Sequence, residues 1–330
     1  EMEKGPQKMM KKQKAEWKKA DGPTARQRAR DEQRMREYER LRNVPLREHV
    51  ESFFPFLLAS DLKDFVVPER WPRPKRAGES STLEEMTTLK LLYSLREAVA
   101  KHQCQRCWAL KQCCICKRIS SVETKNKIYI FMHPHEMLRA SNTGHLIVRS
   151  CPVQSRMLIL GVPAHERILQ DLVKAPHTMV LYPSDTSIPV HEFLKKTQHE
   201  QKLHEEKEEK NRLNIVLLDA TWSQTKSLKK FLARIQTNAG DEYRASFVHI
   251  NLTKPSLFAP LRRQARKDGC STIEAASCAF NELGEKEVSR IWIQTLCMYV
   301  DTICTQGRKD QVYGTFTKEE QTKMRTSVPR

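Results

Sequence analysis

The stretch NIVLLDATWSQ, residues 214–224, joins an apolar run to the start of a helix. The run is apolar without alternation, which is typical of a strand buried on both faces of a parallel sheet. Thr221, with Gln224 three residues later, forms the capping-box pattern that opens helices. Asp219 lies between the two, at the carboxyl end of the strand, where open α/β sheets bind ligands. The stretch therefore predicts an α/β fold with a site at this edge of the sheet.

Similar apolar runs lie on both sides of this stretch, at residues 127–134, 145–151, 156–163, 178–184 and 246–252. Helices fit between and after the runs, at residues 164–174, 189–210, 222–238, 271–284 and 286–304. Strands that alternate with helices predict a mostly parallel sheet with helices on both faces.

Polar residues follow the apolar runs at two further places. Ser271 and Glu274 form a second capping box, at the start of the helix expected over 271–284. Capping alone explains both boxes, but their helix N-termini also present N–H groups that suit a carboxylate or a phosphate. The other segment follows the run at 127–134 and supplies four candidate site residues, which are His133, Glu136, Asn142 and Thr143.

The segment CQRCWALKQCCIC, residues 104–116, contains five of the ten cysteines. Two close pairs, Cys104 with Cys107 and Cys114 with Cys116, can supply four thiolates to a tetrahedral Zn²⁺. The pairs lie nearer each other than in zinc ribbons, so we expect a knuckle that staples one loop. Cys113 could take the place of Cys114, and a set of reduced thiols without metal is the alternative.

The charge indicates a polyanionic partner. The 330 residues include 58 Lys and Arg against 40 Asp and Glu, for a net charge of +18. Nucleic acid is the commonest partner of such a chain. An anionic membrane surface is disfavoured, because there is no basic helix with a broad apolar face. No apolar run approaches the roughly 18 residues needed to span a bilayer.

Composition divides the chain into five parts. Residues 1–43 form a basic, charged arm that suits RNA phosphates or is merely solvated, and that would be helical or disordered by itself. Residues 44–100 contain apolar stretches and predict an extension that docks on the main domain or on a partner. The knuckle at 101–120, the main domain at 121–310 and a tail at 311–330 follow.

These pieces together resemble the DTW-domain family, named for its Asp-x-Thr-Trp box, here Asp219-Ala220-Thr221-Trp222. The resemblance runs from about Cys104 to Leu283. It rests on ordered motifs: the cysteine knuckle, His133-Pro-x-Glu136, Asn142-Thr143, Leu181-Tyr182-Pro183-Ser184, the DTW box, Leu261-Arg262 and Ser271-Thr272-x-Glu274-Ala275. The family is similar in fold to SPOUT methyltransferases, so the resemblance implies a C-terminal trefoil knot, which pattern alone would not predict.

The resemblance implies transfer of the 3-amino-3-carboxypropyl group of S-adenosylmethionine to a uridine in tRNA or rRNA. It implies that Asp219 is a base or orients the uracil, beside Thr221 and Trp222. The Trp222 ring would stack on a substrate ring or, as is more usual for a tryptophan after a strand, pack in the core. The resemblance also implies zinc at Cys104, Cys107, Cys114 and Cys116. The implied cofactor-binding residues are Leu181, Tyr182, Pro183, Ser184, Asp219, Arg262, Ser271, Thr272 and Glu274.

Two alternatives stay open at this point. The family core leaves residues 1–100 unexplained, and a basic extension suits an RNA-binding factor in ribosome assembly, with the DTW domain mainly as a scaffold. Its partners would be a ribosomal subunit or the proteins of an assembly intermediate. Ordinary methyl transfer needs only another pose of the cofactor. The first residue, Glu1, and the basic arm favour the mitochondrial matrix, with the cytoplasm or nucleus as alternatives.

Overall fold

The computed structural model describes residues 25, 29, 32, 35, 36, 82–104, 106–203, 212–251, 255–259, 261 and 269–306. Most of the expected arm and docking extension, the tail at 311–330 and the candidate residue Arg262 lie outside these ranges. The described residues from Glu84 onward belong to one compact unit.

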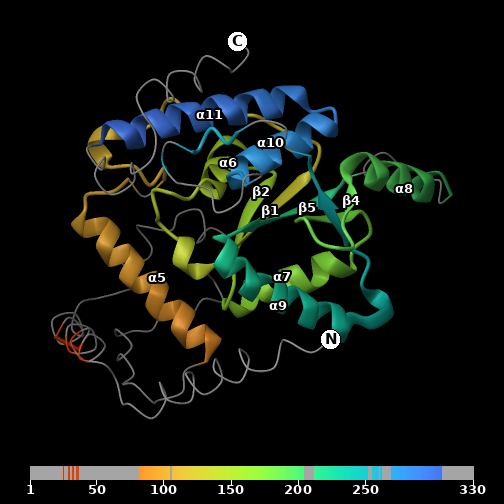
Figure 1. Ribbon diagram of the computed structural model, residues 1–330, viewed down its shortest axis with the longest axis horizontal. Coiled ribbons are helices and arrows are strands. Elements are labelled where there is room, and N and C mark those ends of the chain that lie inside the picture. The colour runs from red at the N-terminus through yellow and green to blue at the C-terminus, as the bar shows by residue number, and fades with distance from the viewer. Residues whose placement is uncertain are drawn as a thin grey trace, which may run out of the picture. The chain divides into compact units, whose positions relative to one another are not determined.

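A six-stranded sheet forms the centre of this unit (Figure 1). The strands are β1 (Lys127–Met132), β2 (Ser155–Ile159), β3 (Thr178–Leu181), β4 (Ile188–Pro189), β5 (Asn214–Asp219) and β6 (Ser246–His249). Their order is β2-β1-β5-β3-β6-β4 and every neighbouring pair is parallel, which confirms the predicted sheet. The register pairs Met132 with Asp219, so β1 and β5 end together.

Helices cover both faces of the sheet, as predicted (Figure 1). The α-helices of the described residues from Thr82 onward are α5 (Leu83–Ala100), α6 (Gly144–Ser150), α7 (Pro163–Lys174), α8 (Val190–Leu203), α9 (Trp222–Ala239), α10 (Thr272–Glu282) and α11 (Lys286–Thr305). Ile130 and Leu217 face a core built with α6, α10 and α11. Phe131 and Val216 face a second core built with α7 and α9. Successive residues of a strand thus point into different cores, which is why the strand runs are apolar throughout.

The run at 145–151 is not a strand, and this part of the prediction was wrong. It forms α6, whose residues Gly144, His145, Leu146, Ile147 and Ser150 are buried. A short apolar run does not distinguish a buried strand from a buried helix. Its place in the chain decides, because parallel strands β1 and β2 need a crossover connection between them, and α6 is that crossover.

The other expected elements agree with the structure within a few residues, and the two-residue strand β4 was not predicted. The helix expected over 189–210 is described only as far as Leu203. Helix α5 comes from the expected docking extension. It buries Leu91, Leu92 and Leu95, and the Thr87 hydroxyl donates to the Leu160 carbonyl at 3.0 Å. This part of the extension therefore docks on the main domain.

The trefoil knot stays a prediction. Across the described ranges, no helix combines the length and the apolar character needed to cross a membrane.

Candidate active site and metal centre

The carboxylate of Asp219 lies buried at the end of β5, with 3% of the residue exposed. The Asn142 amide donates to Oδ2 at 2.6 Å, and the Thr272 hydroxyl donates to Oδ1 at 2.7 Å. The two hydrogen bonds fix the plane of the carboxylate.

Gly144 lies directly against this carboxylate. A Cβ at Gly144 would lie 2.9 Å from Asp219 Cγ and from Ile130 Cγ2, and closer still to Asp219 Oδ2. Real Cβ atoms essentially never come below 3.0 Å of such neighbours. The first residue of α6 must therefore lack a side chain for Asp219 to keep its place.

We expect Gly144→Ala to lower any activity that depends on Asp219 at least tenfold and to cost about 1–3 kcal/mol of unfolding free energy, because the added methyl pushes the carboxylate away from Asn142. Activity and thermal unfolding of the full chain measure the two effects. Gly240→Ala is the matched control: Gly240 has φ +52° and open space around it, so alanine strains the backbone without touching the site. Equal activity loss in both variants would contradict the expectation.

A cavity of about 490 Å³ opens beside Asp219. Its walls bring together residues from all three segments that the sequence singled out: Glu136, Asn142, Thr143, Asp219, Thr221, Trp222, Ser271 and Thr272. Thr143 also joins two of these segments, since its hydroxyl accepts the backbone N–H of Ile273 at 3.3 Å.

A second cavity, of about 310 Å³, follows the carboxyl ends of β3, β5 and β6. Leu181, Tyr182 and Pro183 line it. The two cavities share five wall residues, which are Ala220, Trp222, Cys270, Ser271 and Thr272. Trp222 is thus a wall of both cavities rather than a core residue, and its ring lies 6.5 Å from that of Tyr182.

Three candidates play a visible structural part. The Thr221 hydroxyl accepts the Gln224 backbone N–H at 3.2 Å, which confirms the capping box, and Thr221 lines the larger cavity as well. Glu274 accepts the Ser271 N–H at 2.8 Å and the Ser256 hydroxyl at 2.7 Å, so its carboxylate ties α10 to the segment 255–259. The Ser184 backbone N–H donates to the Ser187 hydroxyl at 3.1 Å, inside the turn after β3.

His133 and Glu136 belong to the turn after β1. His133 Nδ1 accepts the backbone N–H of His135 at 3.2 Å, and burial lowers the pKa of His133 to about 4. Glu136 is 2% exposed, lines the larger cavity and pairs with Arg139 at 2.9 Å. The structure therefore places Glu136 at the site, with His133 in the turn that supports it.

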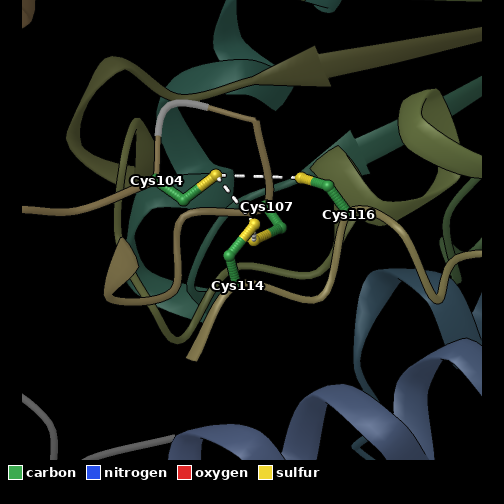
Figure 2. A group of neighbouring side chains, drawn as sticks. All are labelled: Cys104, Cys107, Cys114 and Cys116. Atoms are coloured by element: carbon green, nitrogen blue, oxygen red, sulfur yellow. Dashed lines mark hydrogen bonds between the residues drawn. The ribbon is translucent and has the colours of Figure 1, made fainter. Parts of the chain in front are cut away.

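The four predicted zinc ligands form one cluster, and their sulfur atoms converge in Figure 2. The Cys104 sulfur lies 3.7 Å from that of Cys116 and 3.4 Å from that of Cys114, and the sulfurs of Cys107 and Cys114 are 3.8 Å apart. A tetrahedron with Zn–S bonds of 2.3 Å has S···S edges of about 3.8 Å. The four residues therefore fit a zinc ion.

Electrostatics also fit a metal at this cluster. A hydrogen bond with the Cys107 thiol lowers the pKa of Cys104. Hydrogen bonds with Cys104 raise the pKa of Cys107 to about 11 and also raise the pKa of Cys116. The thiols thus do not ionise together without a cation to balance them. The guanidinium of Arg149 is close enough to act on three of these thiols and would offset part of the negative charge of a tetrathiolate centre.

Sequence reasoning missed Gly144 and His145. His145 is 2% exposed, and its Nε2 lies 3.0 Å from the Cys107 carbonyl oxygen. Burial lowers the pKa of His145 to about 3, so the ring is neutral. His145 opens the run mistaken for a strand, and Gly144 directly precedes that run, although a glycine directly after Asn142 and Thr143 was a signal of close approach.

An α/β domain with a buried carboxylate and two adjoining cavities at the carboxyl ends of its strands is a ligand-binding domain of the open-sheet class. The DTW domain family matches residues 101–311, more than half of the chain, and the chain belongs to this family. The family is known for RNA-modifying aminocarboxypropyl transferases. Comparisons with curated proteins and with solved structures found no match.

Proposed function

We propose that this protein transfers the 3-amino-3-carboxypropyl group of S-adenosylmethionine to a uridine of tRNA or rRNA. The observation that carries the proposal is the position of Asp219, whose hydrogen-bonded carboxylate lines the larger of two cavities with a common wall. Two substrates that react with each other need two adjoining spaces and a group that can accept a proton at one of them.

In the proposed reaction, uracil N3 attacks the γ-carbon of the methionine moiety. The N3–Cγ bond forms as the Cγ–S bond breaks, and the electron pair of that bond goes to sulfur, so methylthioadenosine leaves. The N3 proton goes to Asp219. The sulfonium already activates its three carbons, and the main task of the protein is to decide which carbon faces the nucleophile.

The two cavities suit different substrates. The cavity at β3, β5 and β6 is flanked by apolar and aromatic side chains and by the N-terminus of α10, so it suits an adenosine with its charged methionine tail. The cavity at Asp219 suits the uracil. Trp222, in the wall between the cavities, supplies a flat ring to either one.

A basic groove supports RNA as the partner. It has a volume of about 400 Å³ and lies between α5 and the segment 137–141. Lys90, Lys101 and Arg139 line it together with Glu97, which pairs with Lys101. Ser141 belongs both to this groove and to the larger cavity. An RNA strand with its uracil at Asp219 would thus bring its neighbouring phosphates toward the cationic side chains of this groove.

We expect Lys90→Ala and Lys101→Ala each to weaken RNA binding and to reduce the slope of log K against log salt by about 0.7–0.9, as one phosphate contact is lost. Titration of a labelled RNA at several salt concentrations gives the slope. Lys174→Ala, at the end of α7 and paired with Glu242, is the control and should leave the slope unchanged. An equal reduction of the slope in all three variants would show that RNA does not bind along this groove.

The net charge of +18 also favours a second candidate, an RNA-binding factor of ribosome assembly that uses the DTW domain as a scaffold. Mass spectrometry of nucleosides separates the two functions. Cells with the wild-type protein would be compared with cells carrying Asp219→Ala, for tRNA and rRNA fractions separately. Loss of aminocarboxypropyl-uridine from one fraction supports transfer, whereas an unchanged profile together with an assembly defect on depletion supports the scaffold.

A further inference from the structure

The cysteine knuckle lies against the residue that follows the site glycine. The Cys107 carbonyl oxygen accepts the Nε2–H of His145 at 3.0 Å. The indole ring of Trp108 stacks on the imidazole, with 4.1 Å between ring centroids and 14° between the planes. Cys107 is a candidate zinc ligand, and Trp108 is the next residue in the chain. The knuckle therefore holds the His145 imidazole in two ways, by a hydrogen bond at the ring edge and by stacking on the ring face.

His145 in turn holds Asn142. The backbone N–H of His145 donates to Asn142 Oδ1 at 3.3 Å. Because the ring proton is on Nε2, the ring Nδ1 does not donate to this oxygen, and the ring acts by keeping the backbone of His145 in place. The other end of the Asn142 amide donates to Asp219 Oδ2 at 2.6 Å. Because one end of the amide is an acceptor and the other a donor, fixing its oxygen on His145 turns its N–H group toward the carboxylate.

A second connection runs parallel to the first. Gln103, buried at 4% exposure, donates its amide N–H groups to the carbonyls of Trp108 and Leu138, the latter at 3.0 Å. Trp108 and Leu138 have φ values of +58° and +59°. Left-handed backbone costs a residue with a side chain roughly 1–2 kcal/mol, so it persists only where the surroundings impose it. The loop that leads to Asn142 is therefore shaped against the knuckle.

We propose that the knuckle positions the reaction site, with His145 as the positioning residue through which a metal at the four cysteines sets the orientation of Asn142 and Asp219. Metal holds the loop that carries the Cys107 carbonyl and the Trp108 ring, and both keep His145 in place. The expected effect on the rate of transfer rests on the proposed function, whereas the effect on the orientation of Asn142 and Asp219 does not.

The kinetic test compares His145→Phe with His145→Gln in the full chain. Phenylalanine keeps a ring over Trp108 but has no N–H for the Cys107 carbonyl, whereas the glutamine amide can restore that donor. We expect kcat to fall about 10- to 100-fold in His145→Phe with zinc content and the KM for S-adenosylmethionine unchanged, and to recover in part in His145→Gln. His165→Phe replaces another buried histidine, on α7 and outside both cavities, and should leave kcat unchanged. Equal kcat in all variants would overturn the kinetic role.

A second measurement does not depend on turnover. The side-chain amide of Asn142, assigned by its loss in Asn142→Ser, should give a downfield-shifted NMR signal because it donates to a carboxylate. We expect His145→Phe to move this signal toward the position of a solvated amide, and zinc chelation of the wild type to do the same, whereas His165→Phe should not. An Asn142 signal that neither His145→Phe nor chelation moves would overturn the proposal. If the Asn142 signal moves as expected but the wild-type protein has no transferase activity, the positioning of Asn142 by the knuckle would be supported and only the proposed function would be contradicted.

Discussion

Asp219→Asn should lower the rate of the proposed transfer about 10²- to 10⁴-fold, the usual contribution of a positioned general base. The amide cannot take the N3 proton, and one of its orientations sets an NH₂ group against the Asn142 NH₂ group that now donates at 2.6 Å. The affinity for S-adenosylmethionine should change less than about threefold, since Asp219 lines the cavity assigned to uracil and not the one assigned to the cofactor. Release of methylthioadenosine measures the rate, and calorimetric titration measures the affinity.

Asp171→Asn is the matched control for this experiment, because Asp171 is an exposed residue of α7 with no part in either cavity. It should transfer at the wild-type rate. Transfer by Asp219→Asn within tenfold of the wild type would show that another group accepts the proton. Failure of the wild-type protein to bind S-adenosylmethionine at millimolar concentration would contradict the proposed enzymatic function altogether.

Cys104→Ser should abolish zinc binding at the knuckle and cost on the order of 4 kcal/mol of unfolding free energy, because loss of a structural metal is among the few changes with effects of this size. The reason for a large effect lies in the core. Cys107, Ala109 and Ile115 belong to the same buried cluster as β1 and α11, so a loosened knuckle opens the main core to water. Elemental analysis of the purified chain and its thermal unfolding measure the two changes.

Cys113→Ser is the control for the knuckle. Cys113 lies in the same segment but outside the group of four sulfur atoms, so its variant should keep one zinc per chain and the wild-type unfolding temperature. Loss of zinc from Cys113→Ser instead would mean that Cys113 replaces Cys114 as a ligand. Wild-type protein without any zinc would contradict the metal centre itself.

Local sequence accounts for most of the elements. The runs that form β1, β3 and β5 are apolar throughout because helices cover both faces of the sheet, and the capping box at Thr221 marks where α9 begins. The same reasoning failed for 145–151. An apolar run indicates that a segment is buried, but it does not distinguish a buried helix such as α6 from a buried strand. The need for a crossover helix between β1 and β2 depends on their parallel pairing, which is a property of the whole fold.

The residues of the site are separated widely along the chain. Asp219 is 77 positions from Asn142 and 53 from Thr272, and both bond to its carboxylate. The sequence indicated that each of them follows or opens an element at the ligand-binding edge of a sheet. Hydrogen-bond partners could not be assigned at that stage, because they depend on which strands are neighbours.

By itself, the sequence determined the parallel α/β class, the family, the ends of the main strands and the spacing of a four-cysteine knuckle. These features are local, since burial, capping and thiol spacing each act over a few residues. Only the tertiary structure decided that β1 lies beside β5, that Gly144 leaves room for the Asp219 carboxylate, and that His145 joins the knuckle to Asn142. The physical reason is that strand order and packing across the sheet edge arise from contacts between distant residues, which no local pattern encodes.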